Sequence, residues 1–184
     1  MLGSERLAFI QKKVDEAMIA TDTYPDYRID VEGMAEKLGF AVRRLAMNLP
    51  DIIGLMVIND MSDKMKRQTG SDKLIALNNK YDEPHLRFAI AHELGHFFLH
   101  KECVNGTNPV QFTQVKDDEK GIEEEACRFA AMLLMDKRKF QKAYDELKKD
   151  AGLINIDIIR NLAKKFTVPQ RAVQRRIEEL ADER

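Results

Sequence analysis

Two histidines separated by one helical turn form the clearest chemical pattern in the sequence. His92 and His96 lie four positions apart, and Glu93 directly follows the first of them. Positions four apart lie on one face of an α-helix, so both imidazoles can reach one metal ion, and zinc binds imidazole nitrogen readily. Glu93 supplies the general base that metal-assisted hydrolysis requires. The segment therefore predicts a zinc hydrolase, and more specifically a peptidase in which His92 and His96 bind Zn²⁺.

The residues around this pattern predict the helix that it requires. Apolar residues recur there at three- and four-residue steps, which marks a buried face, and we expect the helix to span about 84–101. Asp82 is a candidate N-cap, and Pro84 suits a first helical turn. Gly95 is unfavourable inside a helix by about 1 kcal/mol relative to alanine. Its presence indicates that a strand or the substrate approaches the helix closely at this point.

A third metal ligand must come from elsewhere, because a catalytic zinc usually has three protein ligands and one open position. The next predicted helix, about 120–135, contains Glu123, Glu124 and Glu125, and successive side chains on a helix point about 100° apart. Glu123 lies on the apolar face of this helix, Glu125 lies beside that face, and Glu124 points most nearly outward. We expect Glu123 to be the ligand, with Glu125 as the alternative. A solvated acidic N-terminus favoured by the helix dipole is the other interpretation, but it leaves the position of Glu123 unexplained.

Composition bounds the class of protein. The chain has 184 residues, of which 44% are hydrophobic and 33% charged, as expected for one globular domain or one domain with a small appendage. A formal net charge of −1 argues against nucleic-acid binding by the chain as a whole. The two cysteines, Cys103 and Cys127, form no disulfide framework. We find no secretory leader and no apolar run of about 18 residues, so we expect a cytoplasmic protein without a membrane partner.

Hydrophobic periodicity predicts an α+β fold that is mostly helical. Three short apolar or alternating runs, 40–47, 52–58 and 73–78, predict a small three-stranded antiparallel sheet packed on the metal-binding helix. Polar residues predict loops at 60–71 and 103–118, and a loop as long as the second is often functional. Helices are expected at about 4–20, 30–38, 84–101, 120–135, 136–149, 155–166 and 169–182.

Two segments of the chain resemble the ImmA/IrrE family of metallo-endopeptidases. They are 87–100, RFAIAHELGHFFLH, and 123–135, EEEACRFAAMLLM. The resemblance covers about residues 30–136. It implies a zincin-like core, similar to a minimal thermolysin, and a gluzincin-like site whose third zinc ligand is Glu123. It also implies a protein substrate, because members that act in regulation cleave a helix-turn-helix repressor and so relieve repression of mobile-element or stress genes.

Two further residues are expected to lie beside the ligands rather than to bind the metal. His100 is one more turn along the metal helix, and the rise of about 6 Å per four residues carries it away from a point that both other histidines reach. Cys127 stands where the family usually has asparagine or aspartate. It lies four residues after Glu123 on the same helical face, so we expect it near a ligating histidine. A thiol is a weaker hydrogen-bond partner than an amide or a carboxylate.

The last two predicted helices, 155–166 and 169–182, resemble a helix-turn-helix in their lengths and short connection. We assign 1–150 to a zinc metallopeptidase domain and 151–184 to a C-terminal helical pair. Six basic residues occur between positions 160 and 176 with no acid among them, which is one argument for DNA contact. We favour a hairpin that docks on the peptidase core or binds the substrate, because Glu178, Glu179 and the near-neutral chain weaken the electrostatic case.

The leading function is thus a zinc endopeptidase that cleaves a helix-turn-helix repressor. Two alternatives stay open from the sequence. One is a DNA-binding regulator whose metal site is structural or sensory. The other is a toxin–antitoxin or phage component that binds a partner protein without cutting it.

Overall fold

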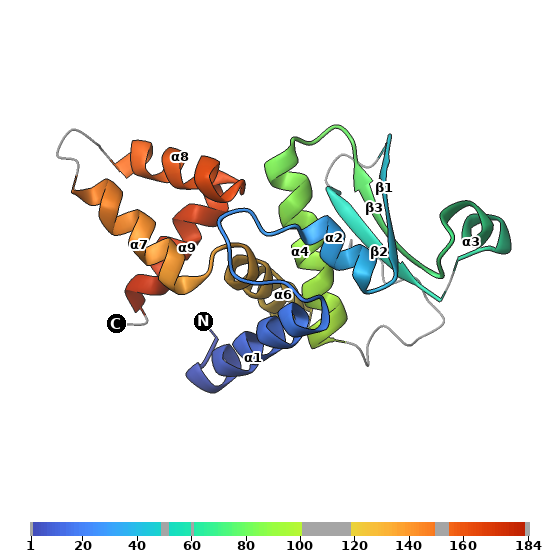
Figure 1. Cartoon of the computed structure of the whole chain (residues 1–184), viewed down its shortest axis with the longest axis horizontal. Helices are drawn as coiled ribbons and strands as arrows, with labels where there is room; N and C mark the ends of the chain where they lie inside the picture. The colour runs from blue at the N-terminus through green and yellow to red at the C-terminus, as the bar shows by residue number, and fades with distance from the viewer. Residues whose placement is uncertain (1, 49–51, 60, 101–118, 150–154, 183–184) are drawn as a thin grey trace.

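The computed structural model describes residues 2–48, 52–59, 61–100, 119–149 and 155–182. Within these ranges the chain forms a mostly helical α+β fold (Figure 1), as the sequence predicts. The strands are β1 (Phe40–Leu45), β2 (Gly54–Ile58) and β3 (Lys73–Asn78). The helices are α1 (Ser4–Ala20), α2 (Val31–Lys37), α3 (Asp63–Thr69), α4 (Glu83–Leu99), α6 (Glu119–Leu134), α7 (Lys137–Lys148), α8 (Asn155–Phe166) and α9 (Gln170–Asp182). The predicted loop at 103–118, which contains Cys103, lies outside the described residues. None of the described helices is both long and apolar enough to cross a membrane.

The three strands form a mixed sheet in the order β1–β3–β2. Strand β2 pairs with β3 in the antiparallel direction, whereas β1 pairs with β3 in parallel, with Phe40 opposite Lys73. The prediction of an antiparallel sheet is therefore wrong for β1 and β3. Side chains alternate with the same two-residue period in both kinds of sheet, so apolar alternation does not reveal strand direction. Strands β1 and β2 run in opposite directions. A strand inserted between them, as β3 is, must therefore be parallel to one of the two.

A short helix, α3, occupies part of the segment predicted as the loop 60–71. The Ser62 side chain accepts a hydrogen bond of 3.3 Å from the backbone N–H of Met65 and so caps the helix. Gly70 ends it in the left-handed conformation, with φ of 73°. No residue of α3 is buried. Because the helix buries no face, the sequence carries no apolar periodicity that would predict it.

Helix α4 covers one face of the sheet (Figure 1). Val42 of β1 and Ile75 of β3 are buried in the same hydrophobic cluster as Ile90 and Leu94 of α4. The intervening strand residues point to the opposite face, where they form a smaller cluster. That cluster contains Ala41, Leu74 and Ala76 from the strands, together with Met47 and Met61 from outside them. The sheet therefore presents a deep apolar face to α4 and positions this helix.

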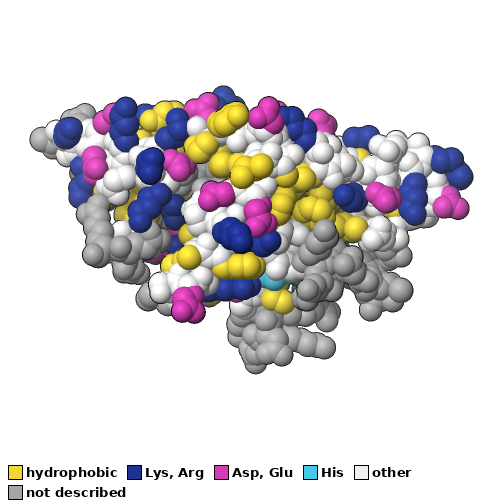
Figure 2. All heavy atoms as spheres, turned by 60° about the horizontal axis from the view of Figure 1, so that its bottom comes forward, with side chains coloured by type: hydrophobic (Ala, Val, Ile, Leu, Met, Phe, Trp, Pro, Cys, Tyr) yellow, Lys and Arg dark blue, Asp and Glu magenta, His cyan; other side chains and the backbone are white. Residues whose placement is uncertain are grey.

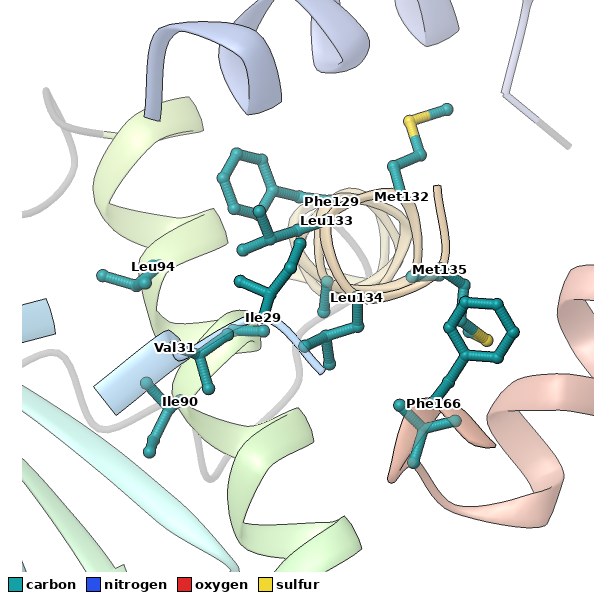
Figure 3. Close-up of a cluster of buried hydrophobic side chains, with 14 of the residues drawn as sticks. Ile29, Val31, Ile90, Leu94, Phe129, Met132, Leu133, Leu134, Met135 and Phe166 are labelled. Carbon is teal, nitrogen blue, oxygen red and sulfur yellow. The ribbon is translucent and has the colours of Figure 1, made fainter. Parts of the chain in front are cut away.

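Helix α6 packs directly against α4 on the side away from the sheet. Figure 3 shows Phe129 and Leu133 of α6 beside α4, and both side chains are fully buried. A Cβ atom added to Gly95 would lie 3.1 Å from both the Cα and the carbonyl oxygen of Ala126. The close approach inferred from Gly95 is therefore made by α6, and not by a strand or the substrate. The glycine lets the two helix backbones meet.

The C-terminal helices extend the same apolar core. Phe140 of α7, Phe166 of α8 and Val173 of α9 belong to the cluster that contains the α4 and α6 residues. Figure 3 shows Phe166 beside Met135, at the end of α6. The boundary between residues 150 and 151 stays a prediction, and residues 150–154 lie outside the described ranges.

Buried cations connect these helices to the core as well. The Arg87 guanidinium of α4 donates hydrogen bonds to the carbonyl oxygens of Ile29, at 2.7 Å, and Thr167, at 3.3 Å. Arg128 of α6 lies 2.5 Å from Glu179 of α9, and both side chains are more than nine-tenths buried. Removing one partner of such a pair leaves an uncompensated buried charge, so the pairing fixes α9 on α6.

Gly95→Ala should destabilise the protein, because the added methyl group would lie 3.1 Å from the backbone of Ala126 and would push the two helices apart. Overpacking of this kind costs about 1–3 kcal/mol. Urea denaturation followed by circular dichroism would measure the loss. Gly121→Ala is the matched control, since among the described residues no atom outside its own stretch of helix lies within 4 Å of a Cβ added there, and its stability should stay the same or rise. A Gly95→Ala protein as stable as the wild type would contradict the close contact.

Candidate metal centre

Helix α4 carries three of the predicted site residues. Its start is set by Asp82, whose side chain accepts a hydrogen bond of 3.2 Å from the backbone N–H three residues later, and Pro84 lies in its first turn. Because the helix continues without interruption past the motif, His92, Glu93 and His96 all have helical geometry. The two imidazoles consequently project from one face.

The side chains of His92, His96 and Glu123 converge. The Nε2 atoms of the two histidines are 2.9 Å apart. Glu123 places Oε2 3.2 Å from His92 Nε2 and Oε1 3.3 Å from His96 Nε2. A tetrahedral ion with bonds of about 2.0–2.1 Å holds its ligand atoms roughly 3.3 Å apart. These separations fit the requirement of one ion, so the three residues could hold a metal.

The three consecutive glutamates of α6 each have a different partner. Glu123 faces the two histidines. Glu124 lies 3.4 Å from Arg175 of α9. Glu125 accepts two hydrogen bonds from Arg6 of α1, both at 2.6 Å. The 100° turn between successive helical residues separates the three carboxylates. The structure therefore brings Glu123 to the histidines and directs the alternative, Glu125, toward α1.

Electrostatics distinguish the two carboxylates nearest the histidines. Burial raises the pKa of Glu93 to about 7, with Glu123 adding to the effect and His92 opposing it. Glu93 is 5% exposed, and its Oε2 has no hydrogen-bond partner among the described residues. Burial also acts to raise the pKa of Glu123, but the hydrogen bonds from His92 and His96 outweigh it and lower the pKa to about 2. The Glu123 carboxylate is thus held ionised, while the Glu93 carboxylate exchanges its proton near neutral pH.

Comparison with known protein families matches residues 35–178 to the IrrE N-terminal-like domain of peptidase family M78. The matched segment is most of the 184-residue chain. The chain belongs to this family. The resemblance to the ImmA/IrrE peptidases is thereby confirmed, and the family makes the protein a metallopeptidase. A search of curated proteins finds no significant match.

His100 follows the last residue of α4, and its polar contact is with Glu125. Its Nε2 lies 2.9 Å from Glu125 Oε2, on the same carboxylate that Arg6 binds. The His100 ring lies beside that of His96, with centroids 5.5 Å apart. Arg6 lies before the segment matched to the M78 family and 119 positions from Glu125. The sequence carries no signal for this contact, because no local spacing rule relates residues so far apart.

Cys127 contacts the edge of the His92 ring opposite the edge that faces Glu123. Its Sγ is 3.5 Å from His92 Nδ1, while Nε2 of the same ring faces Glu123. Cys127 and His100 thus each lie beside a histidine of the convergent group: Cys127 beside His92 and His100 beside His96.

Arg6 and Glu125 should be energetically coupled. A double-mutant cycle with Arg6→Ala and Glu125→Ala, measured by chemical denaturation, should give a coupling energy of up to about 1 kcal/mol, because the pair is bidentate but Arg6 is partly exposed. The control cycle combines Arg6→Ala with Glu124→Ala, which pairs with Arg175 instead. Its two effects should add. Additive effects in the Arg6–Glu125 cycle would show that the pair contributes nothing.

Proposed function

We propose that the protein is a zinc-dependent endopeptidase in which His92, His96 and Glu123 hold Zn²⁺ and Glu93 acts as the general base. One observation carries the proposal: the three potential ligand atoms lie within 4.8 Å of one another. The buried carboxylate of Glu93 is on the same helix as the two histidines. Membership of the M78 family supports the peptidase activity. We further propose that α4, α6 and the sheet form a zincin-like core.

The choice of zinc rests on the donor set and its exposure. Catalytic zinc sites commonly combine two imidazoles and one carboxylate, and they leave a fourth position open. The side chain of His96 is completely buried, whereas those of His92 and Glu123 are 17% and 27% exposed. This one-sided exposure supports an open position that water and a peptide reach.

Glu93 is the residue that moves a proton in the proposed reaction. When bound, zinc supplies Lewis-acid polarisation of a peptide carbonyl and makes water easier to deprotonate. The Glu93 carboxylate takes a proton from the attacking water and delivers it to the nitrogen of the leaving amine. A pKa of about 7 suits both steps, because the group must gain and then lose a proton near neutral pH.

We propose a protein substrate in the cytoplasm. The resemblance to regulatory ImmA/IrrE peptidases favours a helix-turn-helix repressor, whose cleavage would relieve repression of mobile-element or stress genes. The presence of only two cysteines also favours a reducing compartment. A regulatory peptidase of this type acts on few targets, unlike a digestive one.

Four of the six basic residues between positions 160 and 176 have an acidic partner, which weighs against a DNA-binding function. On the face shown in Figure 2, basic and acidic side chains are intermixed. A cation that already has an acidic partner contributes less to DNA affinity, because it must leave that partner to neutralise a phosphate and release a counterion. The pairs join Arg160 to Asp157, Lys165 to Glu146, Arg175 to Glu124 and Arg176 to Glu179. We therefore favour docking of α8 and α9 on the peptidase core.

Glu93→Gln should abolish cleavage while leaving zinc bound, because glutamine keeps the shape of the side chain but does not accept the proton. Loss of general-base catalysis lowers a rate by about 10²–10⁴-fold. The test measures zinc by atomic absorption and cleavage of candidate helix-turn-helix repressors by electrophoresis, with and without a chelator. Glu124→Gln is the matched control and should cleave as the wild type does.

Two outcomes would contradict this assignment. Cleavage by Glu93→Gln at the wild-type rate would exclude Glu93 as the base. A stoichiometric complex with the repressor, without cleavage by the wild type, would favour the partner-binding function instead.

Glu123→Gln should lower zinc affinity by more than the roughly 10–100-fold that is typical when a residue only supports the ligands. Glu125→Gln should retain full zinc content, because its carboxylate binds Arg6 and His100. Competition with a chromophoric chelator measures both affinities. Full zinc binding by Glu123→Gln together with loss in Glu125→Gln would transfer the ligand role to Glu125.

A further inference from the structure

Helix α6 contacts both edges of the His92 ring. Nε2 of the ring lies 3.2 Å from Glu123 Oε2, and Nδ1 lies 3.5 Å from Cys127 Sγ. Glu123 and Cys127 are four residues apart on one helix, so a single helical face supplies both contacts. Hydrogen bonds to sulfur are longer than those to oxygen because the sulfur atom is larger, and 3.5 Å suits such a bond.

The hydrogen bond at one ring nitrogen determines which nitrogen of a histidine is free to bind a metal. A histidine that binds a metal through Nε2 carries its proton on Nδ1, and a partner that accepts this N–H holds the ring in place. In this chain the atom beside His92 Nδ1 is a thiol sulfur. A thiol sulfur accepts hydrogen bonds, although weakly.

Packing alone does not account for a cysteine at this position. Cys127 is half-buried, whereas its neighbours Ala126 and Arg128 are buried. The fully buried apolar positions of α6, such as Phe129 and Leu133, fill the core instead. The thiol therefore lies at the edge of the core, where its contact is the imidazole.

We propose that Cys127 is a positioning residue for the metal site: its Sγ accepts the Nδ1–H hydrogen bond of His92 and so directs Nε2 toward His96 and Glu123. This inference rests on the proposed zinc site. It predicts an order of zinc affinities for variants at position 127, because an amide oxygen is a stronger hydrogen-bond acceptor than a thiol sulfur. The site should hold zinc most tightly with asparagine at position 127, less tightly with cysteine and least tightly with alanine.

The test compares zinc dissociation constants of wild type, Cys127→Ala and Cys127→Asn by competition with a chromophoric chelator. Cys127→Ala should bind zinc about 10–100-fold more weakly than wild type, and Cys127→Asn at least as tightly as wild type. Circular dichroism checks that each variant is folded. Glu124→Ala, on the same helix but paired with Arg175, is the control and should match the wild type.

The outcomes separate this inference from the zinc site itself. Stoichiometric zinc in the wild type and an unchanged affinity in Cys127→Ala would overturn the role of Cys127 alone. An asparagine variant as weak as the alanine variant would do the same, since it would show that only the shape of the side chain matters. Absence of zinc binding in the wild type would overturn the zinc site and this role together.

Cobalt(II) in place of zinc tests whether the sulfur binds the metal directly. Thiolate ligation produces an intense charge-transfer band in the near ultraviolet. We expect no such band in the wild type, because Sγ faces Nδ1 and not the convergent side of the ring. A band that is present in wild type and lost in Cys127→Ala would make Cys127 a ligand and overturn the positioning role.

Discussion

Helices α4 and α6 meet at Gly95 so closely that a Cβ atom there would lie 3.1 Å from the backbone of Ala126, tighter than an ordinary van der Waals contact. This contact lies one residue from His96 and three residues from Glu123 in their respective helices. It therefore decides whether a carboxylate of one helix reaches the imidazoles of the other, and the observed separations are 3.2 and 3.3 Å. The apolar faces of both helices hold this geometry, because Leu94 and Phe129 are fully buried in one close-packed cluster.

The carboxylates at the acidic start of α6 are only partly exposed to water, because neighbouring helices pack around them. Carboxylates removed from water are costly unless they are paired and hydrogen-bonded. Three consecutive glutamates meet three different sets of cationic or imidazole groups: the histidines of α4, Arg175 of α9, and Arg6 with His100. Helix α1 lies outside the segment matched to the M78 family. Helix α1 thus contacts the first turns of α6 through the pairing of Arg6 with Glu125.

The fold illustrates which parts of a structure are encoded locally. The cap of α4 and the apolar faces of α4 and α6 depend on residues within a few positions, and each was predictable from the sequence. The parallel pairing of β1 with β3 was not, because alternation has the same period in either direction. Helix α3 cannot be predicted from apolar periodicity either, because it buries no face and only Ser62 and Gly70 mark its two ends.

The candidate site likewise has some features that local sequence determines and others that depend on long-range packing. The sequence by itself determined the imidazole pair and its neighbouring acid, because one helical turn relates His92 to His96 whatever surrounds the helix. It also ranked Glu123 ahead of Glu125, because helical phase is a local property. Only the tertiary structure decided that Glu125 binds Arg6 and that Gly95 meets α6. Those contacts join residues distant in the chain, and the packing of whole helices, not any local spacing, brings them together.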